Sequence, residues 1–250
     1  MNWKNVTILI LLPLWFGCGM TEARIKKEKE ASAHYKLGIA YLNDNLLQKA
    51  YVEFQKAVEI DPDGKDAQYA LGHVFFQQEN YKEATASFQK ALSIDPQFSE
   101  AHNYLGKVYE AQGKWEKAIT QYQEALKNQQ YDTPEKPYLN LGLVYLNQKR
   151  YDDAIREFQN VLKVDPNNVV AHNARGQAYF QAGKLKDAVS SYQEAIRLAP
   201  NYLDAHYNLA FAYLKEGAKE QAAVAFKKVV DLSPKSQQAE ESRKFLEALR

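Results

Sequence analysis

Four histidines recur at a regular spacing in the sequence, and imidazole nitrogens are common metal ligands, so the four are candidates for metal binding. His34, His102, His172 and His206 each follow an alanine, and successive members lie 34 residues, or about twice that, apart. Zinc ligands must converge within a few ångströms of one ion. Matching places on stacked helices are separated by at least one helix-packing distance, about 8–10 Å. We therefore interpret the four as packing residues and predict no metal site.

No catalytic or cofactor motif accompanies them. The sequence has no glycine-rich phosphate loop, GxSxG elbow, HExxH helix or calcium loop. The acids of the Asp-Pro pairs, such as Asp61, are typical of helix ends, and Glu124 and Glu194 recur with the helical period on faces expected to be solvated. We therefore expect no enzymatic activity and no cofactor.

The overall charge argues against nucleic acid as a partner. Lys and Arg total 32 against 31 Asp and Glu, which gives a net charge of +1. Nucleic-acid binding needs a basic face to displace counterions. A chain of 250 residues, 46% hydrophobic and 25% charged, has the composition of an ordinary globular protein with one large domain or two small ones.

The amino-terminal residues indicate export. Residues 6–16 form an apolar run behind Lys4, which is the only positive charge before it. A membrane-spanning helix needs about 20 apolar residues, so this run predicts a signal peptide over residues 1–17 instead. A charged stretch, residues 18–30, then predicts a tether that leads into the first helix.

The end of the run resembles a bacterial lipoprotein cleavage box. The only cysteine, Cys18, follows the small residue Gly17, although Trp15 occupies the place of the usual leucine. The resemblance implies that Cys18 is lipidated and anchors an exported protein to a membrane; the alternative is a plain signal peptide with an incidental cysteine. Gly19 replaces the aspartate that marks inner-membrane retention, so the resemblance favours the periplasmic face of the outer membrane.

From residue 31 onward the chain repeats itself. A Leu-Gly pair or a looser copy of it marks each repeat, at Leu37-Gly38, Leu71-Gly72, Leu105-Gly106, Leu141-Gly142, Arg175-Gly176 and Leu209-Ala210. The spacings are 34 residues, except for one of 36. Each repeat then has an aromatic residue, an alanine and a second aromatic at fixed offsets, and the second aromatics are Phe54, Phe88, Tyr122, Phe158, Tyr192 and Phe226. Proline closes five repeats, at Pro62, Pro96, Pro166, Pro200 and Pro234.

This pattern resembles the tetratricopeptide-repeat family, whose helix–turn–helix units bury their apolar faces only by stacking. The resemblance implies an all-α, right-handed solenoid of six units, residues 31–64, 65–98, 99–134, 135–168, 169–202 and 203–236. Residues 237–250 look like the helix that caps the last apolar face. The small residues let two helices approach closely, and the aromatics fill the space between them.

The family binds proteins in a concave groove that is lined by its first helices. Carried over to this sequence, the groove positions are Tyr35, Ile39, Leu42, Tyr69, His73, Phe76, Leu139, Leu143, Leu146, Phe180, Tyr207, Phe211 and Leu214. Exposed apolar residues of this kind mark a partner surface. Chaperone-binding relatives place Lys and Asn where Tyr35, Ile39 and Tyr69 stand, so a carboxylate clamp is disfavoured.

Two departures interrupt the pattern. The third unit lacks its proline and is two residues longer, over residues 128–137, which fits either a tolerated insertion or a functional turn. Arg175 occupies a place that is leucine in the other five units, where we expect burial. A buried guanidinium must be paired or must reach solvent, so we interpret Arg175 as structural.

The length, the lipoprotein-like start and the longer third unit together resemble the pilotins of type IV pilus systems. The resemblance implies a protein-binding scaffold that assists assembly or localisation of a secretin, the outer-membrane channel of the pilus. The alternatives are a periplasmic adaptor for proteases or peptidoglycan hydrolases, and an accessory repeat region of an enzyme. The repeats do not separate these alternatives.

Overall fold

A computed structural model describes the backbone of residues 15–249 and the side chains of residues 21–249. Most of the expected signal peptide and the side chain of Cys18 therefore lie outside the described residues. The described chain consists of thirteen α-helices and contains no strand, which confirms the all-α class. No helix in this part of the chain is long and apolar enough to span a bilayer.

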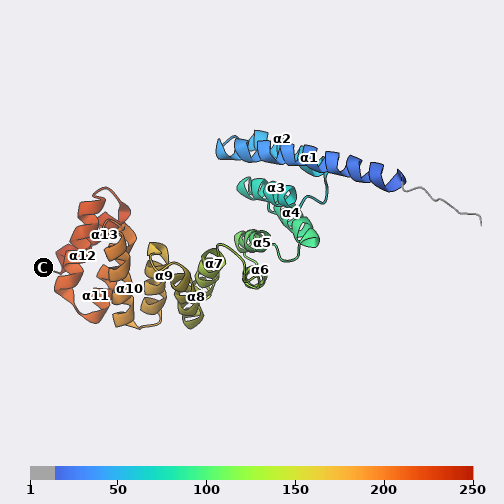
Figure 1. Ribbon diagram of the computed structural model, residues 1–250. Coiled ribbons are helices and arrows are strands. Elements are labelled where there is room, and N and C mark those ends of the chain that lie inside the picture. The colour runs from blue at the N-terminus through green and yellow to red at the C-terminus, as the bar shows by residue number, and fades with distance from the viewer. Residues whose placement is uncertain (1–14, 250) are drawn as a thin grey trace, which may run out of the picture. The chain divides into compact units, whose positions relative to one another are not determined.

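The chain divides into two compact units, residues 1–96 and 97–250, which are described separately (Figure 1). The first contains two helix pairs, α1 (Trp15–Asn43) with α2 (Leu47–Ile60) and α3 (Lys65–Gln77) with α4 (Tyr81–Ile94). The second contains α5 (Ser99–Ala111), α6 (Trp115–Ala125), α7 (Glu135–Asn147), α8 (Tyr151–Val164), α9 (Val169–Gln181), α10 (Leu185–Leu198), α11 (Leu203–Glu216), α12 (Lys219–Leu232) and α13 (Gln237–Ala248).

Helices pack in pairs, and within each of the two compact units each pair contacts the next. Within the second unit, α7 packs on α8, α8 on α9, and so on to α13, while the first helices α5, α7, α9 and α11 also contact one another in turn. Each sequence repeat thus contains two helices. The first helices of neighbouring pairs meet along one side of the unit, where the family places its groove.

The repeated small and aromatic residues form the interior of every pair. The second aromatics are 0–1% exposed, and the alanine four residues before each of them is 0% exposed. Helices α2, α4, α8, α10 and α12 each end two residues before a proline, as predicted. Their last residue before that proline is extended, because the proline ring disfavours the helical conformation there.

Residues 21–30, expected as a tether, continue α1 instead, and all their side chains are exposed. Alanine, lysine and glutamate are strong helix formers, and extending a helix that packing already holds is easier than starting one. Arg24 and Glu28, one turn apart, form an ion pair of 2.8 Å on this extension.

The leucine before each small residue is 2–8% exposed at Leu71, Leu105, Leu141 and Leu209, but Leu37 is 42% exposed. The expectation that this leucine is buried is therefore wrong for the first repeat, residues 31–64. Leu209, for example, packs in the same cluster as Ile196 of α10, the second helix of the preceding repeat. Leu37 has no preceding unit to cover it.

Candidate protein-binding groove

In the compact unit of residues 1–96, the expected groove residues lie on α1 and α3. The Tyr35 ring lies 5.9 Å from the Phe54 ring, and the Tyr69 ring lies 5.8 Å from the Phe88 ring. Burial, with a smaller effect from Asp66, raises the pKa of the Tyr35 hydroxyl. Tyr35 and Tyr69 thus pack against interior rings and keep part of their surface accessible.

All thirteen expected groove residues are half-buried and not openly exposed. The sequence-based expectation of exposed apolar side chains is therefore too strong. In a stacked array, each first helix lies against the next one, so the side chains between them lose part of their accessible surface to a neighbour. A partner would contact their remaining edges.

In the compact unit of residues 97–250, three of the expected groove residues lie around one cavity. Leu146 of α7, Phe180 of α9 and Phe211 of α11 line a hollow of about 440 Å³. The Lys215 ammonium lies 4.7 Å from the Phe180 ring centre. The other lining residues are Asn147, Lys149, Tyr151, Gln177, Gln181, Tyr192 and Asn208, and none is acidic. The amide side chains of this lining were not predicted from the sequence, because the groove positions were assigned mainly from apolar residues.

Helix α13 covers the carboxyl-terminal groove residues. The Tyr207 hydroxyl donates to the Glu241 carboxylate, and the Phe211 ring lies 5.1 Å from the Phe245 ring. Burial and the Glu241 carboxylate raise the pKa of Tyr207 to about 12. Leu214 packs in the same cluster as Phe245. The capping helix thus takes the place of a further first helix and leaves less of these residues for a partner.

Pairs of asparagines connect neighbouring first helices. Asn140 Nδ2 donates to Asn103 Oδ1 at 3.0 Å between α7 and α5, and Asn208 Nδ2 donates to Asn173 Oδ1 at 3.0 Å between α11 and α9. Each bond satisfies polar groups between stacked helices and fixes their register.

The four matching histidines make local contacts, in line with the packing interpretation. His34 Nδ1 lies 2.6 Å from Glu53, and His102 Nδ1 lies 2.8 Å from Gln121. Nε2 of His172 and of His206 bonds instead to the carbonyl of the preceding proline of the repeat, at 3.0 and 2.9 Å. Within the described residues, no three His, Cys, Asp or Glu side chains cluster to hold a metal.

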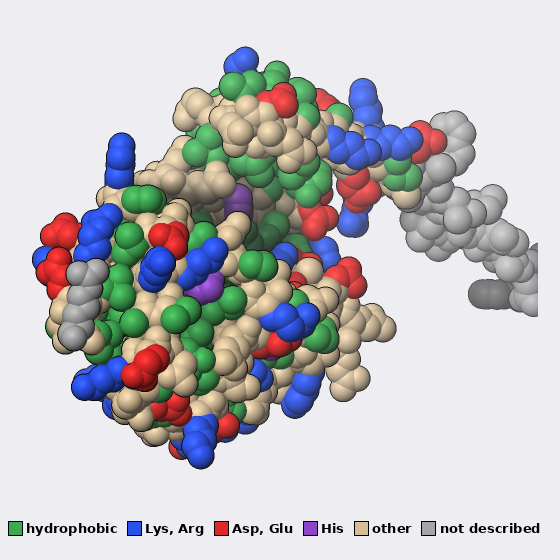
Figure 2. All heavy atoms as spheres, turned by 90° about the vertical axis from the view of Figure 1, so that its left-hand side faces the viewer, with side chains coloured by type: hydrophobic (Ala, Val, Ile, Leu, Met, Phe, Trp, Pro, Cys, Tyr) green, Lys and Arg blue, Asp and Glu red, His purple; other side chains and the backbone are tan. Residues whose placement is uncertain are grey.

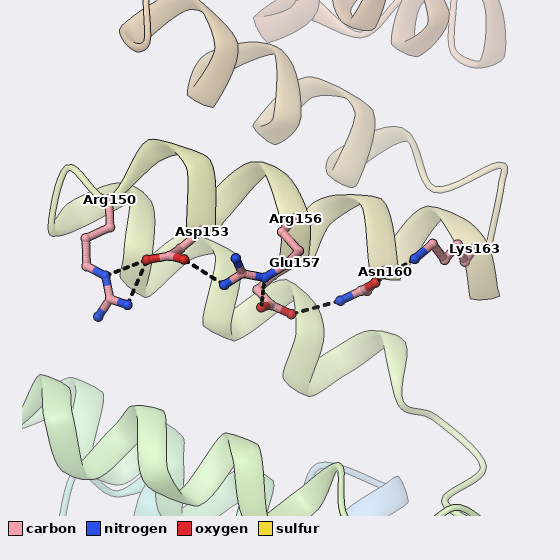
Figure 3. A network of polar contacts seen from close by, with 6 residues as sticks. All are labelled: Arg150, Asp153, Arg156, Glu157, Asn160 and Lys163. Carbon is pink, nitrogen blue, oxygen red and sulfur yellow. Dashed lines mark hydrogen bonds and ion pairs between the residues drawn. The ribbon is translucent and has the colours of Figure 1, made fainter.

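A polar network runs along one face of α8 (Figure 3). Arg150 and Arg156 both bond to the Asp153 carboxylate, at 2.7 and 2.6 Å, and Asn160 bonds to Glu157 at 3.1 Å. The two arginines hold the pKa of Asp153 below its usual range. A carboxylate held in its ionised form by two arginines is a poor general acid, so this face is a charged helix surface.

The longer turn of the third unit is packed against the fold. Tyr131 is 8% exposed and Pro137 is fully buried. The Asn128 side chain accepts a bond of 3.0 Å from the Gln130 amide, which closes a turn after the short helix α6. These contacts give the segment a structural role.

Arg175 is half-buried and bonds to neutral groups. Its Nε donates to Ser191 Oγ at 3.2 Å, and its Nη2 donates to His172 Nδ1 at 3.4 Å. Burial lowers the pKa of the guanidinium. The sixth unit has Leu209 and Ala225 at the places of Arg175 and Ser191. The fold therefore accepts an apolar pair here.

We expect the double substitution Arg175→Leu with Ser191→Ala to stabilise the protein. A buried leucine contributes about 1.5–3 kcal/mol relative to an exposed one. Arg175→Leu alone should be closer to neutral, because it leaves the Ser191 hydroxyl without its donor, at a cost of about 1–3 kcal/mol. Thermal unfolding of the three variants measures this difference. A double variant that melts several degrees below the wild type would show that the guanidinium is needed.

Comparison with known proteins agrees with the repeat geometry. Tetratricopeptide-repeat models match residues 31–63, 72–113, 99–131, 139–202 and 179–243. No curated protein sequence matches the chain. Among solved structures, PilF of Pseudomonas aeruginosa has a TM-score of 0.76 at 24% identity, over 88% of this chain and 99% of that one.

Two further structures share the fold. PilW, a widely conserved type IV pilus biogenesis factor, has a TM-score of 0.76 at 19% identity, over 84% of this chain and 97% of that one. YrrB, a repeat protein with an unusual peptide-binding site, has a TM-score of 0.65 at 22% identity, over 76% of this chain and 97% of that one. The repeated helix pairs, their buried small and aromatic residues and the five matching models place this chain in the tetratricopeptide-repeat family.

Proposed function

We propose that this protein is a binding scaffold that assists assembly or localisation of a secretin for type IV pili. The observation that supports the proposal most is the shared extent of the fold: this chain matches 99% of the PilF chain and 97% of the PilW chain. PilW is a type IV pilus biogenesis factor, which suggests the class of process. The secretin as the partner follows from the pilotin-like sequence features.

The first unit supplies a surface with the right chemistry for a protein segment. Tyr35, Ile39 and Leu42 on α1 and Tyr69 and Phe76 on α3 present apolar edges. A small cavity of about 140 Å³ beside Tyr35 is bordered by the carboxylates of Asp61 and Asp66 and by Glu28, which is paired with Arg24. An apolar segment of the partner that carries a basic residue would satisfy both parts of this surface.

We also propose that Cys18 carries lipid and holds the protein at the periplasmic face of the outer membrane. The support is the sequence alone: an apolar run, Gly17 before the cysteine, and Gly19 after it. Thioether-linked and amide-linked acyl chains together give lasting membrane attachment, since one chain alone binds only reversibly. The exposed helical extension, residues 21–30, would separate the repeats from the membrane surface.

A complementation experiment tests both proposals. In a strain that lacks the protein, we expect few heat-resistant secretin multimers, and we expect the wild-type gene to restore them. The Cys18→Ala protein should no longer be found in the outer-membrane fraction, and it should restore few secretin multimers. Secretin multimers that form normally without the protein would contradict the proposed function. Normal fractionation of Cys18→Ala, with no acyl mass on the mature amino terminus, would contradict the anchor.

The same strain distinguishes the proposed function from its main alternative. An adaptor for proteases or peptidoglycan hydrolases would leave secretin multimers intact and would change cell-wall composition or substrate turnover instead. Crosslinking in intact cells, followed by mass spectrometry, identifies which class of protein contacts the scaffold.

A further inference from the structure

Val224, at the middle of α12, is the most exposed large apolar side chain in the described part of the chain, at 72%. It borders a cavity of about 580 Å³ whose walls come from α10, α11 and α12. Ile196, Leu209 and Ala225 contribute apolar lining. Figure 2, which views the molecule from the side where Figure 1 labels α11 to α13, shows apolar side chains among charges of both signs.

The sixth unit differs from the others at this place. The residue that matches Ala225 is polar in every other unit, namely Glu53, Ser87, Gln121, Glu157 and Ser191. Glu53 and Gln121 there bond to the matching histidines, whereas His206 of the sixth unit bonds back to the Pro200 carbonyl. Repeat packing therefore does not require an apolar residue at the place of Ala225, because the other five repeats pack with a polar one.

Charges flank Val224 symmetrically. Glu220 lies four residues before it and Lys228 four residues after it, so the three share one face of α12. Both charged residues line the same cavity. They stand about 12 Å apart along the helix, from the rise per residue. Neither is in an ion pair with another described residue.

This arrangement is complementary to itself. If a second α12 lies antiparallel across the first, with a two-fold axis at Val224, each Glu220 faces a Lys228 of the other copy. The two Val224 side chains then meet at the centre, next to the apolar cavities. A two-fold interface requires a surface that matches its own image, and the order Glu220, Val224, Lys228 provides it.

We propose that this protein self-associates through α12, with a second copy of the chain as the occupant of the Val224 surface. One helix pair is a small interface, so the dimer is weak and depends on protein concentration. Two anchored copies in one membrane would meet at a higher local concentration than copies in solution. The inference does not depend on the proposed secretin partner.

Paired charge variants of the purified full chain test the proposal by sedimentation velocity over a range of concentrations. Glu220→Lys alone places lysine opposite Lys228, and Lys228→Glu alone places glutamate opposite Glu220, so each variant should remain monomeric. Mixing the two variants restores both ion pairs, and a heterodimer should form with about the wild-type affinity. Val224→Glu should also abolish the dimer.

Val52→Glu is the matched control, because Val52 is the counterpart of Val224 in the first repeat and is 41% exposed. It should dimerise as the wild type does, and circular dichroism should be the same for all variants. A wild-type chain that stays monomeric up to its solubility limit would overturn the proposal. A dimer that survives in both charge variants and in Val224→Glu would overturn it as well, because another surface would then hold the copies together.

Discussion

Gly142→Ala is expected to destabilise the second unit by about 1–3 kcal/mol, the usual cost of overpacking a core. A Cβ atom built at Gly142 would lie 2.4 Å from Cε1 of Phe158, far inside van der Waals contact. The Phe158 ring is 0% exposed, and buried Ala154 and Leu141 belong to the same cluster. The ring therefore cannot move away without disturbing α7 and α8.

Helix propensity opposes this effect but is the smaller term. Alanine favours a helix over glycine by about 1 kcal/mol. The steric conflict should exceed it, and the melting temperature should fall by several degrees in thermal unfolding. Phe158→Leu made in the Gly142→Ala background is the control, because a smaller side chain makes room for the added methyl. The double variant should be more stable than the sum of the single effects predicts. An unchanged or higher melting temperature for Gly142→Ala alone would contradict the account.

Sequence periodicity predicted the fold because each repeated residue has a local reason for its place. Glycine or alanine faces an aromatic ring across each pair, and proline ends the second helix, so helix order and interior follow from spacing. The same periodicity misjudged Leu37, whose burial depends on a preceding unit that the first repeat lacks. The helix over residues 237–250 was expected to cap the last apolar face, but the contact of Phe245 with Phe211 was not named, since it joins residues outside one repeat.

Three of the candidate groove residues were correctly predicted to share one surface, but their partial burial was not predicted. Spacing tells which side of a helix a residue occupies, so Leu146, Phe180 and Phe211 were assigned to one surface that the structure brings together. Spacing does not tell how closely the next helix approaches, which decides how much of each side chain is left exposed. The amides of Gln177 and Asn208 were missed for a different reason: they carry no hydrophobic signal.

The central claim is that the apolar edges of α1 and α3 dock a segment of a partner, proposed to be the secretin. Aromatic anchors at interfaces often lose 2 kcal/mol or more on truncation, roughly thirtyfold in affinity. Tyr69→Ala with Phe76→Ala should therefore weaken binding by about that factor. Both residues are half-buried, so the variant should also melt somewhat lower, and binding must be measured well below its melting temperature.

A suitable control has similar apolar residues away from the groove. Leu46 and Val52 are 40% and 41% exposed in the same unit, and Leu46→Ala with Val52→Ala should bind as the wild type does. Tyr207 and Phe211 are less suitable, because their contacts with α13 would mix loss of stability with loss of binding.

The most direct measurement is the affinity of the purified protein for the isolated secretin, by titration calorimetry, for the wild type and these two double variants. The account predicts that Tyr69→Ala with Phe76→Ala raises the dissociation constant about thirtyfold, while Leu46→Ala with Val52→Ala leaves it unchanged. Wild-type affinity in the Tyr69 and Phe76 variant, or no measurable binding of the wild type to the secretin, would contradict it.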